Sequence, residues 1–341
     1  MPQSDSNKNK QICWVITEGM AGTQNQCIAV AQALGLDPVI KQISLNWPWS
    51  LLSPYLGFEI SCSFKEINQT DNKTSDTHAR NAHSIKAPWP DIAICSGRKS
   101  IAAARYIKKK SGGRTFTLQI QDPRVTPSQF DLVAVPAHDK LRGDNVIVTD
   151  TAPNRITTHT LDEAKTRFTE DFGKFKSPRI AFLVGGDSKT HKLTEACIEN
   201  MCQDIKTARD TGASVLITTS RRTGIKNEKA IQNALPEDHT YFWGASQNPA
   251  ETNPYFGMMA WADAIVVTED SVSMVSDALS TGKPVYIYKL EGQSTKFDRF
   301  YANIIEKGFA RPYEGKIEPY TYNIEPAAQI VANEVRRRVS L

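Results

Sequence analysis

An acidic residue stands where a glycine-rich turn would ordinarily receive a phosphate. The segment TEGMAGTQNQ, residues 17–26, follows the apolar run ICWVI and precedes the helix-like run CIAVAQALGL. Backbone N–H groups and the helix dipole at such a turn attract anions, and Glu18 would repel one. A carboxylate there can instead bind a sugar hydroxyl or remove its proton, so Glu18 is a candidate general base. The alternative is that it only caps the turn.

Other polar residues of this turn could also contact a ligand. Gly19 and Gly22 do not have the G-x-G-x-x-G spacing of a dinucleotide-binding fold, so a nicotinamide cofactor is not expected. Asn25 and Gln26 could either contact a ligand or cap the N-terminus of the helix that follows. Both interpretations stay open.

Polar residues also follow two later strand-like runs. The segment LQIQDPRVTPSQFDLVAVPAHD, residues 118–139, places Asp122 and Arg124 after one run and His138 after the next. Ligands of open parallel sheets bind outside the carboxyl ends of the strands, which favours a functional role for these residues. An Asp–Arg ion pair that fixes a proline turn would look the same in the sequence.

The second half of the chain has similar loops. Gly185 and Gly186, in GGDS, allow a ligand to approach the backbone closely. The segment TTSRRTG, residues 218–224, provides Ser220 and Arg221 at another strand end. Planar guanidinium groups suit diphosphate oxygens, although arginines on a loop can also be merely solvated.

Alternating strands and helices must position these loops. Apolar runs predict strands at about 12–17, 92–95, 115–120, 132–135, 146–148, 179–184, 214–218, 240–243, 264–267 and 284–288. Helical patterns lie near 25–35, 98–110, 192–211, 228–234, 255–262, 271–281, 298–307 and 324–339. This alternation indicates an α/β protein with parallel sheets that are covered on both faces.

The length of the chain favours two domains. At 341 residues it exceeds what one hydrophobic core comfortably serves, which is about 250–300 residues. The charged stretch FTEDFGKFKSPR, residues 168–179, precedes a new strand and is the expected boundary. We therefore expect an N-terminal domain over 1–173 and a C-terminal domain over 174–341, whose last helix could pack back on the first domain.

Composition excludes several functional classes. The net charge of +4 is small and no basic stripe interleaved with aromatics occurs, so nucleic acid is not an expected partner. No apolar run is long enough to span a bilayer, and the polar N-terminus does not resemble a signal peptide, so we expect a cytoplasmic protein. The six cysteines lack zinc-binding spacing and are expected to be reduced thiols.

The set of motifs resembles one known family. The segment NPYFGMMAWADAIVVTEDSVSMVSDALSTGKPVYIYKLEG, residues 253–292, is joined by TEGMAGTQNQ, DIAICSGRKS, QDPR, DLVAVPAHD, GGDS and TSRRT. Taken together, in their order along the chain, these motifs resemble the mitochondrial-fission (elongated mitochondria) family of bacteria and plants over nearly the whole chain. Its members are grouped as candidate glycosyltransferases of the GT-B fold, which implies two Rossmann-like domains facing across a cleft. The first loop reads EG where the family more often has DG.

Part of that segment is also similar to the nucleotide-sugar segment of lipid-linked-sugar transferases. The resemblance assigns Asp277 to the ribose hydroxyls, and Ser271 and Ser273 to the diphosphate. Asp270 departs from it, because a negative charge beside a helix N-terminus would repel a diphosphate. Asp270 could be a helix N-cap or could face the hydroxyls of the donor sugar.

These observations lead to a hypothesis of glycosyl transfer from a nucleotide-sugar donor to a cell-envelope glycolipid or glycan. Glu18 is the first candidate base and Asp122 the second, and the acceptor side comprises Gly22, Asn25, Gln26, Arg124 and His138. The nucleotide-sugar side comprises Gly185, Gly186, Ser220, Arg221, Asp270, Ser271, Ser273 and Asp277. No acidic triad or D-x-D pair has metal-binding spacing, so we expect metal-independent chemistry with no cofactor besides the donor.

Two other functions are compatible with the same residues. The protein could epimerise or hydrolyse a nucleotide sugar. It could also be a non-enzymatic adaptor that keeps the fold, because a plant relative takes part in mitochondrial division by recruiting a dynamin-like protein.

One apolar segment suggests contact with a membrane. LNWPWSLLSPYLGF, residues 45–58, combines tryptophans, a tyrosine, a phenylalanine and leucines around two prolines, and it is too short to span a bilayer. Such aromatic residues settle at the headgroup boundary, so the segment could dock the protein peripherally on the inner face of the cytoplasmic membrane. Alternatively, it covers the core of the first domain.

Overall fold

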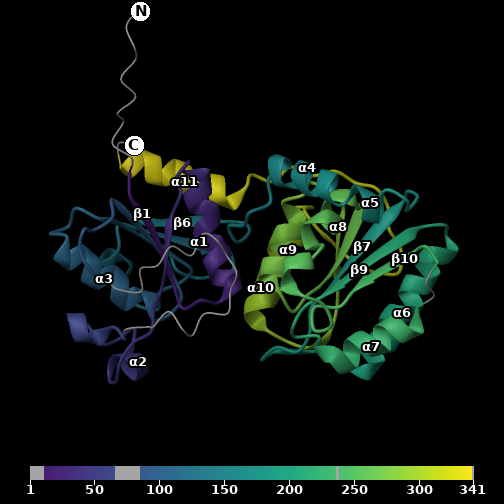
Figure 1. Cartoon of the computed structure of the whole chain (residues 1–341), viewed down its shortest axis with the longest axis horizontal. Helices are drawn as coiled ribbons and strands as arrows, with labels where there is room; N and C mark the ends of the chain where they lie inside the picture. Colours follow the sequence, from purple (N-terminus) through teal and green to yellow (C-terminus); the bar gives the residue numbers. More distant parts are fainter. Residues whose placement is uncertain (1–10, 66–84, 236–237, 340–341) are drawn as a thin grey trace, which may run out of the picture. The chain divides into compact units, whose positions relative to one another are not determined.

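The chain forms two compact α/β units. In the computed structural model, residues 11–65, 85–235 and 238–339 are described (Figure 1). The first unit comprises Met1–Arg155 and Pro326–Leu341, and the second comprises Ile156–Glu325. The expected boundary at 173/174 therefore lies inside the second unit, and the last helix belongs to the first.

The first unit contains a six-stranded parallel sheet with the strand order β2-β1-β3-β4-β5-β6. Its strands are β1 (Cys13–Thr17), β2 (Val39–Gln42), β3 (Ile92–Ser96), β4 (Phe116–Ile120), β5 (Leu132–Pro136) and β6 (Val146–Thr149). Its helices are α1 (Ala21–Ala33), α2 (Trp49–Leu52), α3 (Ser100–Lys110) and α11 (Ala327–Arg338).

Both faces of this sheet are covered, and successive side chains of β1 therefore point into two different cores. Cys13 and Val15 face a core that α1 and α11 complete, and these two helices are in contact (Figure 1). Trp14 and Ile16 face the opposite core, which α3 and part of the segment 43–64 complete. Side chains of successive strand residues point to opposite faces, so a strand with apolar residues throughout is buried on both.

The second unit repeats this plan, with the strand order β10-β9-β7-β11-β12-β14 and parallel pairing throughout. Its strands are β7 (Arg179–Val184), β9 (Ser214–Thr219), β10 (Thr240–Trp243), β11 (Ala264–Thr268), β12 (Val285–Tyr288) and β14 (Arg311–Pro312), with a separate antiparallel pair β8 (His191–Lys192) and β13 (Glu291–Gly292). Its helices are α4 (Thr158–Arg167), α5 (Thr169–Phe172), α6 (Glu195–Asp210), α7 (Gly224–Ala234), α8 (Tyr255–Trp261), α9 (Val272–Leu279) and α10 (Thr295–Glu306).

Strand β7 separates two cores in the same way. Phe182 faces the core beneath α6, and Leu183 faces the core beneath α9 and α10. The α/β architecture predicted from the sequence is thus confirmed, with parallel sheets covered on both faces.

Several elements differ from the sequence prediction: α2, α5, β8, β13 and β14 are short and were not predicted, and β2, α4 and α1 differ for identifiable reasons. Strand β2 was not predicted because it is short and contains Lys41, whose ammonium lies 3.8 Å from the centre of the Trp14 ring. Helix α4 was not predicted because Ala164 is its single buried residue, so it shows no apolar stripe. Helix α1 begins at Ala21, four residues earlier than expected.

The position of α4 and α5 explains where the units divide. Both helices contact α8 in the second unit, and Phe172 is fully buried there beside Met258. Among the described residues, no helix is both long and apolar enough to cross a membrane.

We expect Phe172→Ala to destabilise the second unit selectively. Removing a fully buried phenylalanine side chain costs about 3–5 kcal/mol in the free energy of unfolding. Limited proteolysis in urea, followed by mass spectrometry, should show earlier cleavage within 179–325 and unchanged cleavage within 92–149. Phe130→Ala is the matched control, because Phe130 is buried in the first unit and should give the opposite pattern. Earlier cleavage of the first unit in Phe172→Ala would contradict the division described above.

Candidate functional site

Each sheet has one switch point, where the chain stops adding strands on one side of the first strand and begins to add them on its other side. In the first unit, β1 lies between β2 and β3, and in the second, β7 lies between β9 and β11. The helices that follow β1 and β3 cover opposite faces, as do those that follow β7 and β11. In open α/β sheets, ligands bind at such switch points, outside the carboxyl ends of the strands.

Glu18 lies at the switch point of the first unit. Its Oε1 accepts a hydrogen bond from the backbone N–H of Lys99 at 3.0 Å, and its Oε2 lies 3.4 Å from the Lys99 ammonium. The two side chains keep 21% and 28% of their surface exposed. Gly97 has a φ of +100°, and a Cβ added there would lie 3.1 Å from Oε1. The carboxylate thus joins the loops after β1 and β3 and still reaches solvent.

The early start of α1 changes the interpretation of three candidates. Gly22, Asn25 and Gln26 lie inside this helix, so neither Asn25 nor Gln26 is its N-cap, a position held by Met20. Gly22 and Asn25 are exposed. Gln26 is buried, and its Oε1 accepts a hydrogen bond from Gln121 Nε2 at 3.2 Å. That bond brings the loop after β4 against α1.

Asp122 stabilises its own turn. Its Oδ1 accepts a hydrogen bond from the backbone N–H of Arg124 at 2.8 Å, and Arg124 has a φ of +57°. A short acidic side chain that binds the backbone two residues later is the usual way to hold such a turn. The second oxygen of Asp122 remains for other partners, and both residues are exposed. His138, by contrast, is buried after β5 and only 5% exposed.

Asp270 organises the switch point of the second unit. Its Oδ2 accepts from the backbone N–H of Gly186 at 3.1 Å and lies 2.6 Å from the Arg222 guanidinium. Its Oδ1 accepts from the Thr268 hydroxyl at 2.7 Å, and that hydroxyl oxygen accepts from the N–H of Gly185, also at 2.7 Å. The Asp270 side chain has no exposed surface. The N-cap of α9 is Ser271 rather than Asp270, and both oxygens of Asp270 have partners within the protein.

The two glycines are required by the protein's own packing. A Cβ at Gly185 would lie 1.9 Å from Asp270 Oδ1, and one at Gly186 would lie 2.2 Å from the carbonyl oxygen of Arg222. The Thr223 hydroxyl also donates to the carbonyl oxygen of Gly185. The sequence predicted that a ligand could approach the backbone of these glycines closely. In the structure, atoms of neighbouring loops make that close approach.

The arginine pair divides into two roles. Arg222 is bound to Asp270, and its backbone N–H donates to Ser220 Oγ at 3.2 Å. Arg221 is exposed on the same turn. The Arg222 side chain is also 42% exposed, so the two arginines differ in the ion pair that Arg222 forms with Asp270.

A carboxyl group on α9 lies beside this switch point. Ser271 is the N-cap of α9, and its hydroxyl accepts from the Met274 N–H at 3.4 Å. Ser273 and Asp277 are four residues apart, so they lie on one face of the helix. Asp277 Oδ2 accepts from the hydroxyl of Tyr255, the first residue of α8, at 3.0 Å. Burial raises the pKa of Asp277 to about 7, and the hydrogen bond from Tyr255 offsets only part of that rise.

Sequence reasoning missed the partners of these groups. Lys99 and Tyr255 lie in the motifs DIAICSGRKS and NPYFGMMAW but were not predicted as site residues, and their contacts with Glu18 and Asp277 indicate a role. Glu228 is fully buried on α7, where it accepts from the Thr219 hydroxyl at 2.8 Å and from the Ser246 N–H at 3.0 Å. It thereby joins the loops after β9 and β10.

Lys283 lies away from the strand-end groups of the second unit. Its ammonium donates to the carbonyl oxygens of Met259, Ala260 and Ala262 at 2.7, 2.6 and 2.5 Å, where it caps the C-terminus of α8. Burial lowers its pKa to about 8. It precedes β12, so it lies at the opposite edge of the sheet from the strand ends.

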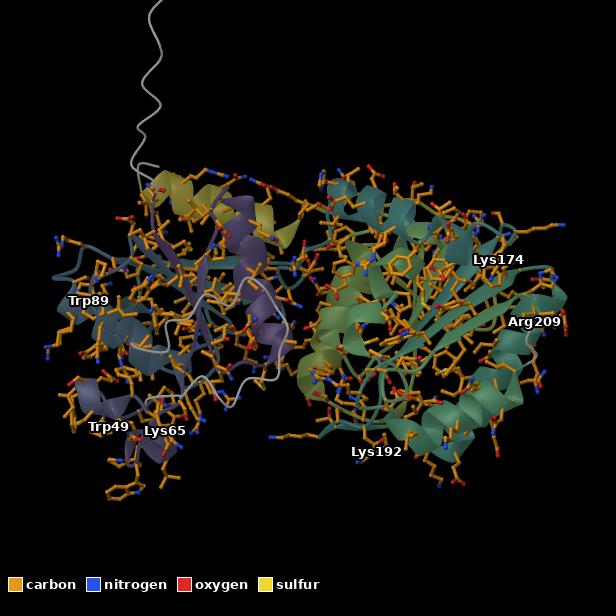
Figure 2. All side chains as sticks on the ribbon, in the orientation of Figure 1. Trp49, Lys65, Trp89, Lys174, Lys192 and Arg209 are labelled. Atoms are coloured by element: carbon orange, nitrogen blue, oxygen red, sulfur yellow. The ribbon has the colours of Figure 1, made fainter. Side chains whose placement is uncertain are left out.

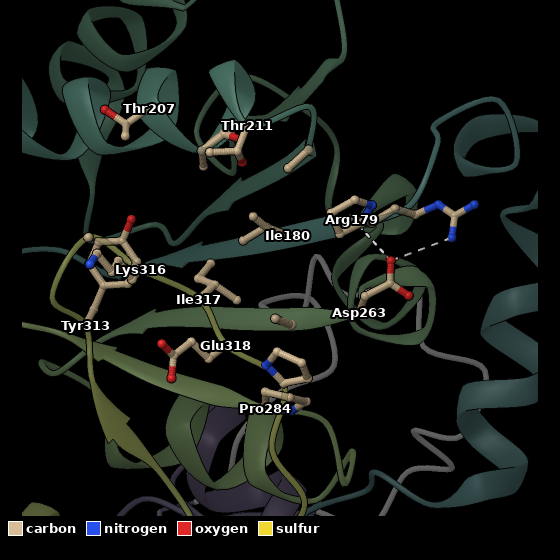
Figure 3. A pocket seen from close by; sticks show the side chains of 16 residues that line it. Arg179, Ile180, Thr207, Thr211, Asp263, Pro284, Tyr313, Lys316, Ile317 and Glu318 are labelled. Carbon is tan, nitrogen blue, oxygen red and sulfur yellow. Dashed lines mark hydrogen bonds and ion pairs between the residues drawn. The ribbon is translucent and has the colours of Figure 1, made fainter.

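A pocket of about 510 Å³ also lies at that opposite edge (Figure 3). Ile180, Ala264 and Pro284, at the beginnings of three strands, form one wall, and Thr207 and Thr211 of α6 form another. None of the candidate residues lines it. This pocket therefore lies away from the groups that could do chemistry, and the strand-end groups remain the candidate site.

The segment 45–60 of the first unit divides into buried and exposed side chains. Trp49 is 9% exposed, and its Nε1 donates to the carbonyl oxygen of Phe58 at 2.7 Å. Trp47 is 79% exposed. We define the aromatic surface as the exposed apolar residues of this segment: Trp47, Leu51, Leu52, Tyr55, Phe58 and Ile60. Figure 2 shows Trp49 and Lys65 in this part of the first unit.

Comparison with known proteins gives consistent matches over most of the chain. The family model described as Mitochondrial fission ELM1 matches residues 21–339. The mitochondrial fission protein ELM1 of Arabidopsis thaliana is 27% identical over 364 residues, which cover 88% of this chain and 84% of that protein.

Solved structures resemble the chain in fold. The S. aureus MnaA–UDP co-structure has a TM-score of 0.53 at 14% identity, with 97% of both chains covered. The UDP-GlcNAc 2-epimerase of Methanocaldococcus jannaschii has a TM-score of 0.50 at 10% identity, with 95% of this chain and 99% of that chain covered. At these identities the likeness shows the fold, which is of the GT-B type.

We expect Asp270→Ala to destabilise the second unit by at least about 2 kcal/mol, because it removes bonds from a buried charged acceptor to three donors. Asp187→Ala, in the neighbouring loop after β7, is the matched control, since the Asp187 side chain is 52% exposed and paired with Lys192. Urea denaturation followed by circular dichroism should show a lower midpoint for Asp270→Ala alone. Equal midpoints would show that Asp270 does not support this edge of the sheet.

Proposed function

The chain belongs to the mitochondrial fission ELM1 family, and we propose that it transfers a sugar from a nucleotide-sugar donor to a cell-envelope glycolipid or glycan. One observation carries the proposal. Asp277, a carboxyl group held by a tyrosine, lies on the helix that begins at the switch point of a GT-B fold. The similar S. aureus MnaA chain was solved with UDP, which supports a nucleotide ligand for the same fold.

The second unit would hold the donor. Asp277 accepts hydrogen bonds from the ribose hydroxyls, as a carboxylate with two oxygens can. Ser271, Ser273 and the N-terminal N–H groups of α9 face the diphosphate, and Arg221 neutralises the charge that develops on it as it leaves. Asp270 and Arg222 act indirectly, since their ion pair fixes the loop that begins at Gly185.

The first unit would hold the acceptor. Glu18 removes the proton of the acceptor hydroxyl, the oxygen bonds to the anomeric carbon of the donor, and the nucleoside diphosphate leaves with the bonding electrons. Lys99 holds the Glu18 carboxylate in place through its backbone N–H and its ammonium group. Asp122 is the second candidate base, with Asn25 and Arg124 as exposed groups that could orient the acceptor.

The aromatic surface would dock this unit peripherally on the inner face of the cytoplasmic membrane. Tryptophan, tyrosine and leucine side chains in one exposed group suit the boundary between headgroups and acyl chains. Within residues 44–65, the charged residues are Glu59 and Lys65. Glu59 is buried against Arg105, whereas Lys65 is exposed, so the charge presented here is positive and complements anionic headgroups.

Titration calorimetry with UDP-, GDP-, ADP- and CMP-sugars tests the donor site. We expect one nucleotide class to bind, and Asp277→Asn to weaken it by about 1–3 kcal/mol because an amide accepts less well than a carboxylate. Asp210→Asn, an exposed acid at the end of α6, is the control. If no nucleotide sugar binds, the adaptor function replaces the enzyme, and product analysis separates transfer from epimerisation or hydrolysis.

Donor affinity should also depend on pH. With a pKa of about 7, the Asp277 carboxyl group is mostly protonated at pH 6 and mostly ionised at pH 8. The ionised form is the one that accepts two hydroxyls, so affinity should rise by up to about tenfold over this interval. The rise should be absent in Asp277→Asn. An affinity that is independent of pH in the parent protein would remove Asp277 from the nucleotide site.

Co-sedimentation with vesicles of phosphatidylglycerol and phosphatidylethanolamine tests the aromatic surface. Trp47→Ser combined with Leu51→Ser and Tyr55→Ser should reduce the bound fraction severalfold and leave donor binding unchanged. Ile225→Ser with Ile305→Ser, exposed residues of the second unit, is the matched control. Trp49→Ser is unsuitable because that side chain is buried. Equal sedimentation of the triple variant and the parent would contradict docking through this surface.

A further inference from the structure

The backbone beneath the aromatic surface is held by an arginine from the site of the first unit. The Arg98 guanidinium donates to the carbonyl oxygens of Ser50, Leu51 and Ser53 at 3.0, 3.3 and 2.8 Å. In return, the Ser53 hydroxyl donates to the carbonyl oxygen of Arg98 at 3.1 Å. Four hydrogen bonds thus join α2 and the residue after it to the loop that follows β3.

These bonds satisfy carbonyl groups that a short helix leaves without partners. The last carbonyls of any helix have no partner within the helix, and α2 has only four residues. A guanidinium supplies charge-assisted bonds to them in a fixed planar arrangement. Arg98 is itself exposed, but its bonds pair these carbonyls within the protein, so the aromatic side chains can leave water without exposing unpaired carbonyls to a poorly hydrated layer.

The next residue of the same loop holds the candidate base. Lys99 donates its backbone N–H to Glu18 and places its ammonium 3.4 Å from the same carboxylate. On the other side, Ser100 begins α3, and its hydroxyl donates to the carbonyl oxygen of Gly97 at 2.7 Å. Two consecutive residues therefore bind the aromatic surface and Glu18, within a loop that is fixed at both ends.

We propose that Arg98 is a positioning residue that couples contact of the aromatic surface with a membrane to the placement of Lys99 and Glu18. The acceptor that this arrangement serves carries its reactive hydroxyl at the membrane surface. The coupling rests on the docking included in the proposed function. A surface that is held at the membrane restrains α2, and Arg98 passes that restraint to the Lys99 N–H and its hydrogen bond with Glu18.

Arg105 provides an internal comparison. It binds the same segment from α3, donating to the carbonyl oxygens of Pro54 and Leu56 at 2.8 Å each and forming an ion pair with Glu59. It lies beyond the loop that holds Glu18. Substitution of Arg105 should therefore loosen the aromatic surface without breaking the link between that surface and Lys99.

Amide hydrogen exchange of the full chain, with and without vesicles of phosphatidylglycerol and phosphatidylethanolamine, tests the coupling. In the parent protein, vesicles should slow exchange in residues 47–60 and also at the amide of Lys99, by about tenfold. In Arg98→Lys, residues 47–60 should still be slowed while the Lys99 amide is not. In Arg105→Lys, both should be slowed, and thermal melting should show that both variants are folded.

The outcomes separate this inference from the proposal on which it rests. If vesicles slow residues 47–60 of the parent but leave the Lys99 amide unchanged, docking stands and the coupling is overturned. If neither region responds in the parent, docking itself fails. If Arg98→Lys retains the slowing at Lys99, Arg98 is not the coupling residue.

Discussion

The edge of the second sheet depends on one buried carboxylate. Asp270 binds the loop after β7 through Gly186, the end of its own strand through Thr268, and the loop after β9 through Arg222. A buried charge is costly unless it is paired and hydrogen-bonded, and here both oxygens are engaged. The start of α9 therefore has a fixed place relative to the neighbouring loops. Every candidate donor residue, from Gly185 to Asp277, lies on an element that this carboxylate touches or adjoins.

The first sheet also has a carboxylate at its switch point, but this one follows β1, the counterpart of β7 rather than of β11, and its environment differs. Glu18, like Asp270, binds a neighbouring loop at the switch point, but about a fifth of its side chain is exposed. Exposure leaves room for a further partner, whereas complete burial does not. A carboxylate at a switch point is therefore a supporting group in one unit and a candidate reactive group in the other. The deciding variable is access to solvent.

Access also separates the two tryptophans of the aromatic segment. Trp49, the first residue of α2, is buried, and its Nε1 donates to a carbonyl oxygen. Trp47, by contrast, is exposed. Arg98 and Arg105 bind the backbone of this segment from within the unit. The segment is thus a structured part of the first unit, and its outward side chains stand on a backbone whose polar groups are largely satisfied.

The sequence alone was sufficient for the architecture, because continuous apolar runs such as ICWVI and the helix-like runs between them are local properties of the chain. It also indicated the strand-end loops, including the one with Glu18, since parallel sheets collect such loops at one edge. Asp277 was assigned by the family resemblance, and its role stays a prediction. It could not show that α4 and α5 belong to the second unit, because α4 has no apolar stripe and Phe172 finds its partners far along the chain. Nor could it distinguish Asp270 from Glu18, or Arg222 from Arg221. Those roles depend on burial and on partners from other strands, which only the tertiary structure brings together.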